Sequence, residues 1–160
     1  YVTVWDVDII IPVNQVLETM DFLRKGADFA YPYDKSFCDM SYEIRNIYIE
    51  QRSVNKLIEL RSFMNELYNP NPVGGAFFAN RLFYIDSGLE NTLFYGWGIE
   101  DGERYMRWLA QKRIIRRSSG PLFHLSHPRG INSIMQNQDS ALNKKRLFFS
   151  TIRGQEWKDN

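Results

Sequence analysis

Runs of β-branched and aromatic residues alternate along this chain with stretches in which apolar residues recur at helical spacing. The runs predict short strands, because such side chains pack well on a pleated surface. Alternation of strands with helices is typical of a layered α/β domain. The expected strands lie at residues 1–5, 9–11, 28–33, 73–79, 113–117 and 122–125.

Helix signals separate these strands. Asn14 is a candidate N-cap and Gly26 a candidate C-cap of the first helix, and residues 69–72, which include two prolines, end a longer helical region. That region, residues 41–68, predicts one long helix or two shorter ones. Further helices are expected at residues 81–86, 100–112 and 139–152. The buried face of the long region is expected to consist of Ile44, Ile47, Ile58, Phe63, Met64 and Leu67.

Composition narrows the class of protein. A length of 160 residues predicts one domain, and 44% hydrophobic with 24% charged residues predicts a globular one. The net charge of +1 gives no electrostatic signature of nucleic-acid binding. The single cysteine, Cys38, excludes an internal disulfide framework and fits a reducing compartment.

Membrane-spanning runs and targeting signals determine where a protein is located in the cell. No run approaches the ~20 apolar residues that span a bilayer. The chain opens inside an expected strand without an initiator Met, so we expect further sequence upstream, and a targeting signal is not readable. For a bacterial source we expect a protein of the cytoplasm or of the membrane periphery.

Two acidic residues, Asp6 and Asp8, lie between the first two expected strands. Carboxylates two residues apart at a strand end can bind one divalent ion, since Mg²⁺ and Mn²⁺ take oxygen ligands and bridge carboxylates to phosphates. The alternative is a turn or a helix-cap pair. The flanking apolar runs favour metal binding, because ionised acids avoid the rim of a buried sheet unless something pairs with them.

The segment Phe94-Tyr-Gly-Trp-Gly-Ile-Glu-Asp101 joins an aromatic loop to a helix start. Glycines on both sides of Trp97 favour presentation of the indole, and a helix N-terminus favours ionised Glu100 and Asp101. A carboxylate beside an exposed indole suits a general base that faces a sugar hydroxyl. The alternative is an acidic helix start after an aromatic loop.

Two shorter motifs also have candidate chemistry. His124 and His127 are the only histidines of the sequence, and neutral imidazole binds ions such as Mn²⁺. A lone histidine is more often structural, but two within four residues favour a ligand role for at least one. Gly74 and Gly75 open a strand, where they allow either close approach of the backbone to a ligand or tight packing.

These four motifs occur in the order found in one enzyme family. Val4-Trp-Asp-Val-Asp-Ile-Ile-Ile-Pro12, Gly74-Gly-Ala-Phe77, Gly96-Trp-Gly-Ile-Glu-Asp101 and Leu122-Phe-His-Leu-Ser-His127 resemble the motifs of inverting, GT-A-type glycosyltransferases. The pattern is similar to the C-terminal catalytic half of β-1,4-galactosyltransferases and of the galactosaminyl and glucuronosyl transferases of chondroitin synthesis. The Gly-Trp-Gly-x-Glu-Asp element is the specific part of this resemblance, and the Asp-x-Asp pair precedes it in the family order.

The resemblance implies a partial GT-A fold, a mixed sheet flanked by helices, without the N-terminal nucleotide-binding half. Residues 1–160 would form a single domain that binds the metal and the acceptor. The implied activity is that of a hexosyltransferase, which moves a hexose or N-acetylhexosamine from a UDP-sugar to a glycan acceptor with inversion. The implied cofactor is Mn²⁺ or Mg²⁺, and the implied protein partner is the missing half or an oligomer partner.

The resemblance also implies residue roles. Asp8, and less directly Asp6, would hold the metal with His127, and His124 would be a second imidazole ligand. Asp101 would be the catalytic base, and Glu100 would hold the acceptor or donor sugar. The implied substrate contacts are Trp97, Tyr95, Gly98, Gly74 and Gly75.

Two departures from the family pattern matter. Ile99 replaces the usual glycine, and Gly102 follows where acids often continue, which leaves the acceptor open. The nucleotide-binding residues that precede the acidic strand in the family are absent from this sequence. A non-catalytic carbohydrate-binding or partner subunit and a metal-dependent phosphohydrolase remain alternatives, although the intact acidic and histidine motifs argue against loss of catalysis.

We expect residues 1–160 alone to show little or no sugar transfer, because the uridine pocket is largely missing. The measurement is a transfer assay on the purified chain with UDP-sugars and Mn²⁺. Robust turnover would overturn this expectation.

Overall fold

A computed structural model describes residues 1–94, 98–128, 130 and 138–156. The chain forms two compact units, and each is described by itself. The sheet unit comprises Tyr1–Asn80 and Ile114–His127, and the helical unit comprises Arg81–Arg113 and Pro128–Asn160. Within the described part of the chain, no helix is long and apolar enough to cross a membrane.

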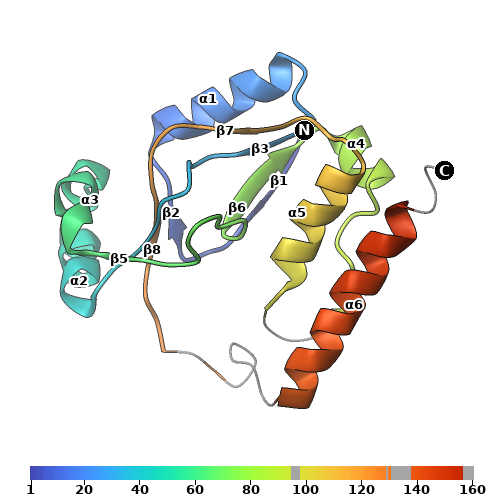
Figure 1. Ribbon diagram of the computed structural model, residues 1–160. Helices are drawn as coiled ribbons and strands as arrows, with labels where there is room; N and C mark the ends of the chain where they lie inside the picture. The colour runs from blue at the N-terminus through green and yellow to red at the C-terminus, as the bar shows by residue number, and fades with distance from the viewer. Residues whose placement is uncertain (95–97, 129, 131–137, 157–160) are drawn as a thin grey trace. The chain divides into compact units, whose positions relative to one another are not determined.

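The described strands of the sheet unit form two four-stranded sheets (Figure 1). They span Val2–Trp5 (β1), Ile9–Ile10 (β2), Phe29–Tyr31 (β3), Phe37–Asp39 (β4), Asn65–Glu66 (β5), Ala76–Ala79 (β6), Ile115–Arg117 (β7) and Leu122–His124 (β8). The strand orders are β1-β6-β3-β7 and β2-β8-β4-β5. Each sheet has one parallel pair, β3 with β7 and β4 with β8, so both are mixed.

Helices flank both sheets, which confirms a mixed α/β architecture. These helices are α1 (Val13–Arg24), α2 (Tyr42–Gln51) and α3 (Val54–Leu60). The core between α1 and the first sheet consists of Leu23, Ala27, Ala30 and Phe78. The core between α2, α3 and the second sheet consists of Cys38, Met40, Ile44, Leu57 and Phe123.

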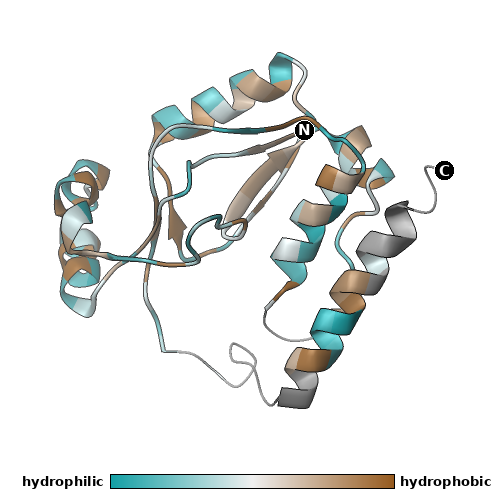
Figure 2. Cartoon of the chain, in the orientation of Figure 1, coloured by the Kyte–Doolittle hydropathy of each residue, from teal (hydrophilic) through white to brown (hydrophobic). Residues whose placement is uncertain are grey.

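Helix α1 begins earlier than predicted. Pro12 occupies the N-cap position, so Asn14 lies within the first turn instead of capping it. Gly26, with φ 95°, lies just past the helix end, where left-handed backbone favours glycine. Hydropathy colouring shows hydrophilic turns on α1 and a hydrophobic β6 (Figure 2).

Residues 41–68 form two helices, followed by a 3-10 turn at Arg61–Phe63 and by β5. Ser41 and Ser53 each cap a helix start, because each hydroxyl accepts a backbone N–H three residues later. Arg52 lies between them with φ 50°, and this left-handed residue ends α2. Of the two predicted possibilities, the structure therefore selects the pair of shorter helices.

The buried face predicted for this region is wrong at several positions. Ile44 is buried, but Ile58 and Phe63 are 48% and 75% exposed. Leu57, which was not predicted, is fully buried. The break at Arg52 changes the helical phase, so spacing counted across it selects the wrong side of α3.

The helical unit contains, in its described residues, α4 (Arg81–Asp86), α5 (Glu100–Ala110) and α6 (Gln138–Glu156). Helix α5 packs against α6 and has a buried, charged face. Glu103 and Arg107 form a buried ion pair of 2.8 Å, and Arg107 also donates to the carbonyls of Ser87 and Leu89. These hydrogen bonds attach the loop that follows α4 to the side of α5.

Gly75 links the turn that contains Asp6 and Asp8 to the core of the second sheet. Its φ is 82°, and a Cβ there would lie 2.9 Å from Leu122 Cδ1 and 3.1 Å from Phe37 Cε2. Its carbonyl accepts a hydrogen bond of 2.9 Å from the backbone N–H of Asp6. Tight packing, one of the two alternatives that the sequence leaves open, is therefore observed at Gly75.

We predict that Gly75→Ala destabilises the protein more than Gly26→Ala does. Both positions have a left-handed backbone, so each alanine costs roughly 1 kcal/mol of strain. A Cβ at Gly26 would meet no described atom within 4 Å, whereas crowding at Gly75 should add about 1–3 kcal/mol. Urea unfolding measures the difference, and equal losses would refute the packing explanation.

Candidate functional site

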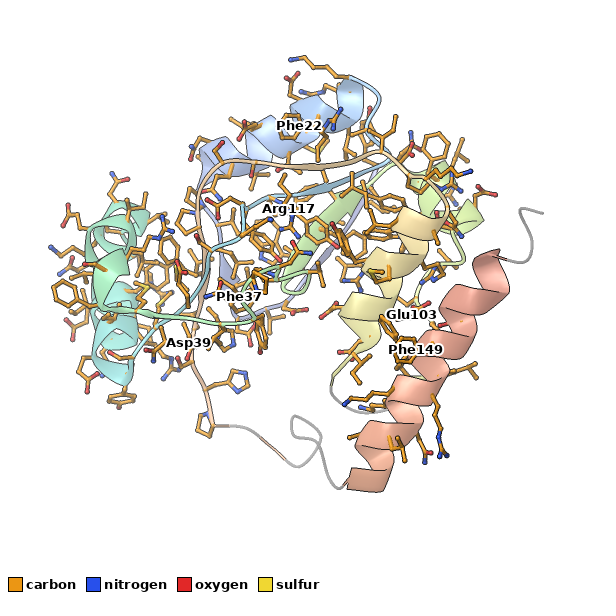
Figure 3. All side chains as sticks on the ribbon, in the orientation of Figure 1. Phe22, Phe37, Asp39, Glu103, Arg117 and Phe149 are labelled. Atoms are coloured by element: carbon orange, nitrogen blue, oxygen red, sulfur yellow. The ribbon has the colours of Figure 1, made fainter. Side chains whose placement is uncertain are left out.

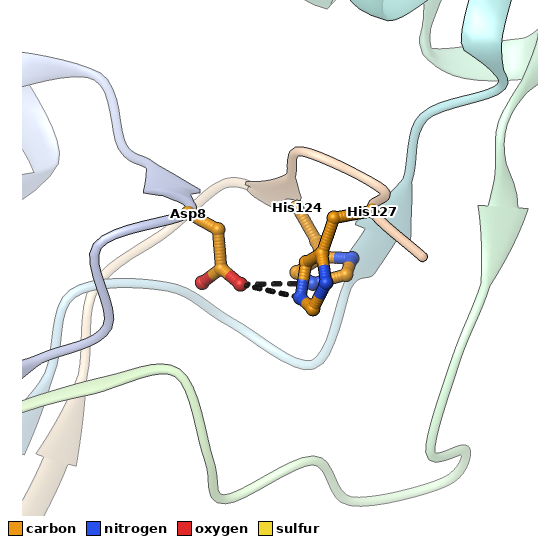
Figure 4. Close-up of side chains that lie close together, drawn as sticks. All are labelled: Asp8, His124 and His127. Carbon is orange, nitrogen blue, oxygen red and sulfur yellow. Dashed lines mark ion pairs between the residues drawn. The ribbon is translucent and has the colours of Figure 1, made fainter. Parts of the chain in front are cut away.

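Three side chains from two distant segments of the sheet unit converge beside β2 and β8 (Figure 4). Asp8 Oδ2 lies 3.0 Å from His127 Nε2 and 3.5 Å from His124 Nε2. One ligand atom of each residue lies within 4.8 Å of the other two. The geometry therefore allows one ion to contact all three side chains.

The pairing of β2 with β8 brings these residues together. Ile9 lies opposite His124 in the antiparallel register, and the backbone N–H of Leu125 donates a hydrogen bond of 2.8 Å to the Asp8 carbonyl. His127 follows three residues after the end of β8. Backbone hydrogen bonds thus set the separation of Asp8 and His124.

Asp39 belongs to the same site and was not predicted from the sequence. Its Oδ1 lies 2.6 Å from His124 Nδ1 and 2.9 Å from Ser126 Oγ. Asp39, labelled in Figure 3, is the last residue of β4. It lies opposite His124 in the register of the parallel pair of β4 and β8. One signal was available, an acid directly after the apolar pair Phe37-Cys38, which resembles the strand-end pattern that singled out Asp8.

The donor set fits a transition-metal ion. Two imidazole nitrogens and one carboxylate oxygen suit ions such as Mn²⁺, whereas Mg²⁺ prefers oxygen ligands alone. The side chains of His124, Asp8 and His127 are 16%, 26% and 43% exposed, so the cluster is most accessible at His127. An ion bound to all three side chains would keep coordination positions for substrate oxygens or water.

Asp6 and the two glycines take part in the hydrogen bonds around the turn between β1 and β2. The Asp6 carbonyl accepts from the N–H of Ile9 at 3.1 Å, and its side chain is exposed. Among the described residues, Asp6 is not one of the three ligand groups that lie together. The Gly74 carbonyl accepts a hydrogen bond of 2.7 Å from Tyr33 Oη. A ligand role for Asp6 and donor contacts for Gly74 and Gly75 stay predictions.

The predicted base opens α5 in the helical unit and takes part in an ionic network. Asp101 Oδ1 accepts a hydrogen bond of 2.5 Å from Arg104, and the buried Arg104 also donates to Glu90 at 2.9 Å. Glu90 accepts from Tyr84 Oη at 2.9 Å, and burial together with this hydrogen bond raises the pKa of Tyr84 to about 12. Three side chains that were not predicted therefore orient Asp101.

Glu100 is the first residue of α5 and is partly buried. Burial raises the pKa of its carboxyl group, and the negative charge of Asp101 acts in the same direction. Its Oε2 is buried and has no hydrogen-bond partner among the residues that the structure describes. A carboxyl group in this state accepts a proton more readily than an exposed one.

The two residues before α5 both have a left-handed backbone. Gly98 has φ 101° and Ile99 has φ 77°, a region that β-branched residues avoid. Ile99 stands where the resembled motif has glycine, so the backbone keeps a glycine-like conformation although the side chain has changed. Trp97 and Tyr95, the predicted sugar contacts, lie outside the described residues.

Comparisons with protein-family models, with curated proteins and with solved structures find no match to this chain. The functional interpretation therefore rests on the motifs and on the geometry of the site. In the sheet unit, that geometry consists of the cluster of Asp8, His124 and His127 with its Asp39 partner. The helical unit separately contains the ionic network around Asp101.

We predict opposite pH dependences for two first-turn glutamates. The pKa of Glu100 is raised in the folded protein, so its contribution to stability is present below the unfolded-state pKa. That contribution is lost as the pH rises through the folded-state pKa. Glu100→Gln should therefore be more stable than the parent chain at neutral pH and equal to it in acid.

Glu43, in the first turn of α2, is the matched control. A hydrogen bond from Ser41 lowers its pKa, so its contribution is present above the unfolded-state pKa and lost as the pH falls. Glu43→Gln should therefore be less stable than the parent chain at neutral pH. Thermal unfolding from acid to neutral pH checks both signs, and a destabilised Glu100→Gln at neutral pH would be inconsistent with the burial argument.

Proposed function

We propose that this chain is the metal- and acceptor-binding part of a glycosyltransferase that moves a hexose or N-acetylhexosamine from a UDP-sugar to a glycan with inversion. The observation that carries the proposal is the convergence of Asp8, His124 and His127. These residues come from two separate motifs of the resembled family. Their proximity supports a shared role, because nothing in the spacing of the motifs alone requires them to meet.

An ion bound to these residues would act as a Lewis acid toward the departing diphosphate. Asp8 would contribute the oxygen that faces both imidazoles, and the two histidines would contribute Nε2 atoms. The exposure of His127 leaves the cluster open to the oxygens of a substrate. A nucleoside diphosphate therefore fits the site better than an uncharged ligand does.

Asp101 would act as the general base. In an inverting transfer, the acceptor oxygen bonds to the anomeric carbon while the bond from that carbon to the diphosphate oxygen breaks. The electron pair leaves with UDP, and the hydroxyl proton passes to Asp101. Arg104 supports this role because it fixes the orientation of the carboxylate. The proposed sugar contacts are Glu100, Trp97, Tyr95, Gly98, Gly74 and Gly75.

We predict that Mn²⁺ binds this chain, and binds more tightly when UDP is present, because the diphosphate supplies further oxygen ligands. Asp8→Asn should weaken Mn²⁺ binding at least about 10-fold. Removal of a residue that only contacts a metal ligand already causes a loss of this size, and Asp8 would bind the ion itself. Isothermal titration of Mn²⁺ with and without UDP, on both proteins, measures these affinities.

Asp21→Asn is the matched control. It makes the same chemical change on the surface of α1, where Asp21 forms an ion pair of 2.6 Å with Lys25, and should leave Mn²⁺ binding unchanged. Full Mn²⁺ affinity in Asp8→Asn would rule out the metal site. Saccharide binding without metal would support the carbohydrate-binding alternative instead.

A further inference from the structure

We infer that Asp39 is a positioning residue that fixes His124 in the tautomer with its proton on Nδ1, and so presents the Nε2 lone pair to the metal. The inference rests on the proposed function, since it assigns a role within the same site. Asp39 lies in none of the four motifs that resemble the transferase family.

The hydrogen bond between the two residues defines the tautomer. His124 Nδ1 and Asp39 Oδ1 are 2.6 Å apart, which is short even for a bond to a charged acceptor. An ionised carboxylate only accepts hydrogen bonds, so the imidazole nitrogen donates. The proton of a neutral His124 is therefore on Nδ1, and Nε2 has a free lone pair.

On the other side of the ring, the Nε2 lone pair of a neutral His124 faces a second acceptor. His124 Nε2 lies 3.5 Å from Asp8 Oδ2, farther than the 3.0 Å that separates this oxygen from His127 Nε2. A lone pair and a carboxylate oxygen are both acceptors and repel each other at this distance. A metal ion between Nε2 and Oδ2 would satisfy both atoms, as would a proton bound to Nε2, and only the metal leaves the imidazole neutral.

Asp39 itself is held from two directions. Ser126 Oγ lies 2.9 Å from the same Oδ1 and also contacts the Met40 carbonyl. The backbone N–H of Met40 donates a hydrogen bond of 3.1 Å to the His124 carbonyl. These contacts fix the side chain of Asp39 and the backbone that follows it, so the carboxylate is oriented before any ion binds.

The position of Asp39 separates its role from that of a ligand. It contacts Nδ1, whereas the ligand atoms of the cluster face Nε2, and it is not among the three groups that lie together in the described chain. An outer-shell carboxylate of this kind fixes the ring and raises the basicity of the bound nitrogen, and its loss typically weakens metal binding about 10–100-fold.

The test uses ¹⁵N NMR of the histidine rings, which is simple to assign because the chain has two histidines. Spectra of the metal-free protein at about pH 8, where an ordinary imidazole is neutral, report which nitrogen is protonated. In the parent chain His124 should have its proton on Nδ1. Asp39→Ala should abolish this preference and weaken Mn²⁺ binding about 10–100-fold by titration.

Cys38→Ala is the matched control, because it removes a buried side chain from the neighbouring position of β4. It should lower stability but keep both the tautomer and the Mn²⁺ affinity. Ser126→Ala should cause a smaller loss of affinity than Asp39→Ala, since it removes only the second contact to Oδ1. If Cys38→Ala shifts the tautomer as Asp39→Ala does, the role of Asp39 is merely structural and the inference fails.

The outcomes separate this inference from the proposed function. Unchanged Mn²⁺ affinity in Asp39→Ala, together with weakened binding in Asp8→Asn, would overturn the role of Asp39 and leave the metal site intact. A parent chain that holds the Nδ1–H tautomer but binds no Mn²⁺ would overturn the proposed metal site. In that case the loss of the tautomer in Asp39→Ala would still support the positioning of His124 by Asp39.

Discussion

Strand β8 is hydrogen-bonded to β2 on one side and to β4 on the other, and the candidate metal site depends on these two pairings. His124 ends β8 and lies opposite Ile9 of β2 and Asp39 of β4. The register thereby places Asp8 near one ring nitrogen of His124 and Asp39 at the other. A slip of either strand by one residue would turn these side chains to opposite faces of the sheet.

The two compact units use charged residues in different ways. In the sheet unit, Asp8 and Asp39 are partly exposed and lie beside imidazoles, an arrangement that suits an exchangeable ion. In the helical unit, the arginines of α5 are buried, and each one pairs with a carboxylate. Breaking such a pair leaves an uncompensated buried charge, which costs free energy. The ion pair with Arg104 therefore restrains the Asp101 carboxylate.

Local signals in the sequence predicted the elements that depend on local contacts. The helix at residues 81–86 and the strand at residues 1–5 are confirmed as α4 and β1, within a residue or two of the expected ends. Strand β4 was not predicted, because three residues are too few to show the alternation of apolar and polar side chains that identifies a strand. Asp39 was missed for a related reason, since its importance comes from a parallel pairing with residues far along the chain. Asp8, His124 and His127 were each recognised as candidate ligands from their residue types and neighbours, but their grouping into one site came from the resemblance to the transferase family.

The start of α5 contains two unfavourable features in succession. The left-handed backbone of Ile99 costs roughly 1–2 kcal/mol, and burial opposes ionisation of Glu100. The start of α2 lacks both features, since it has a serine cap with extended backbone and an exposed glutamate whose pKa is lowered. Local features that oppose stability persist mainly where binding or catalysis requires them. The contrast between these two helix starts therefore favours a functional role for Glu100 and Asp101 over simple capping.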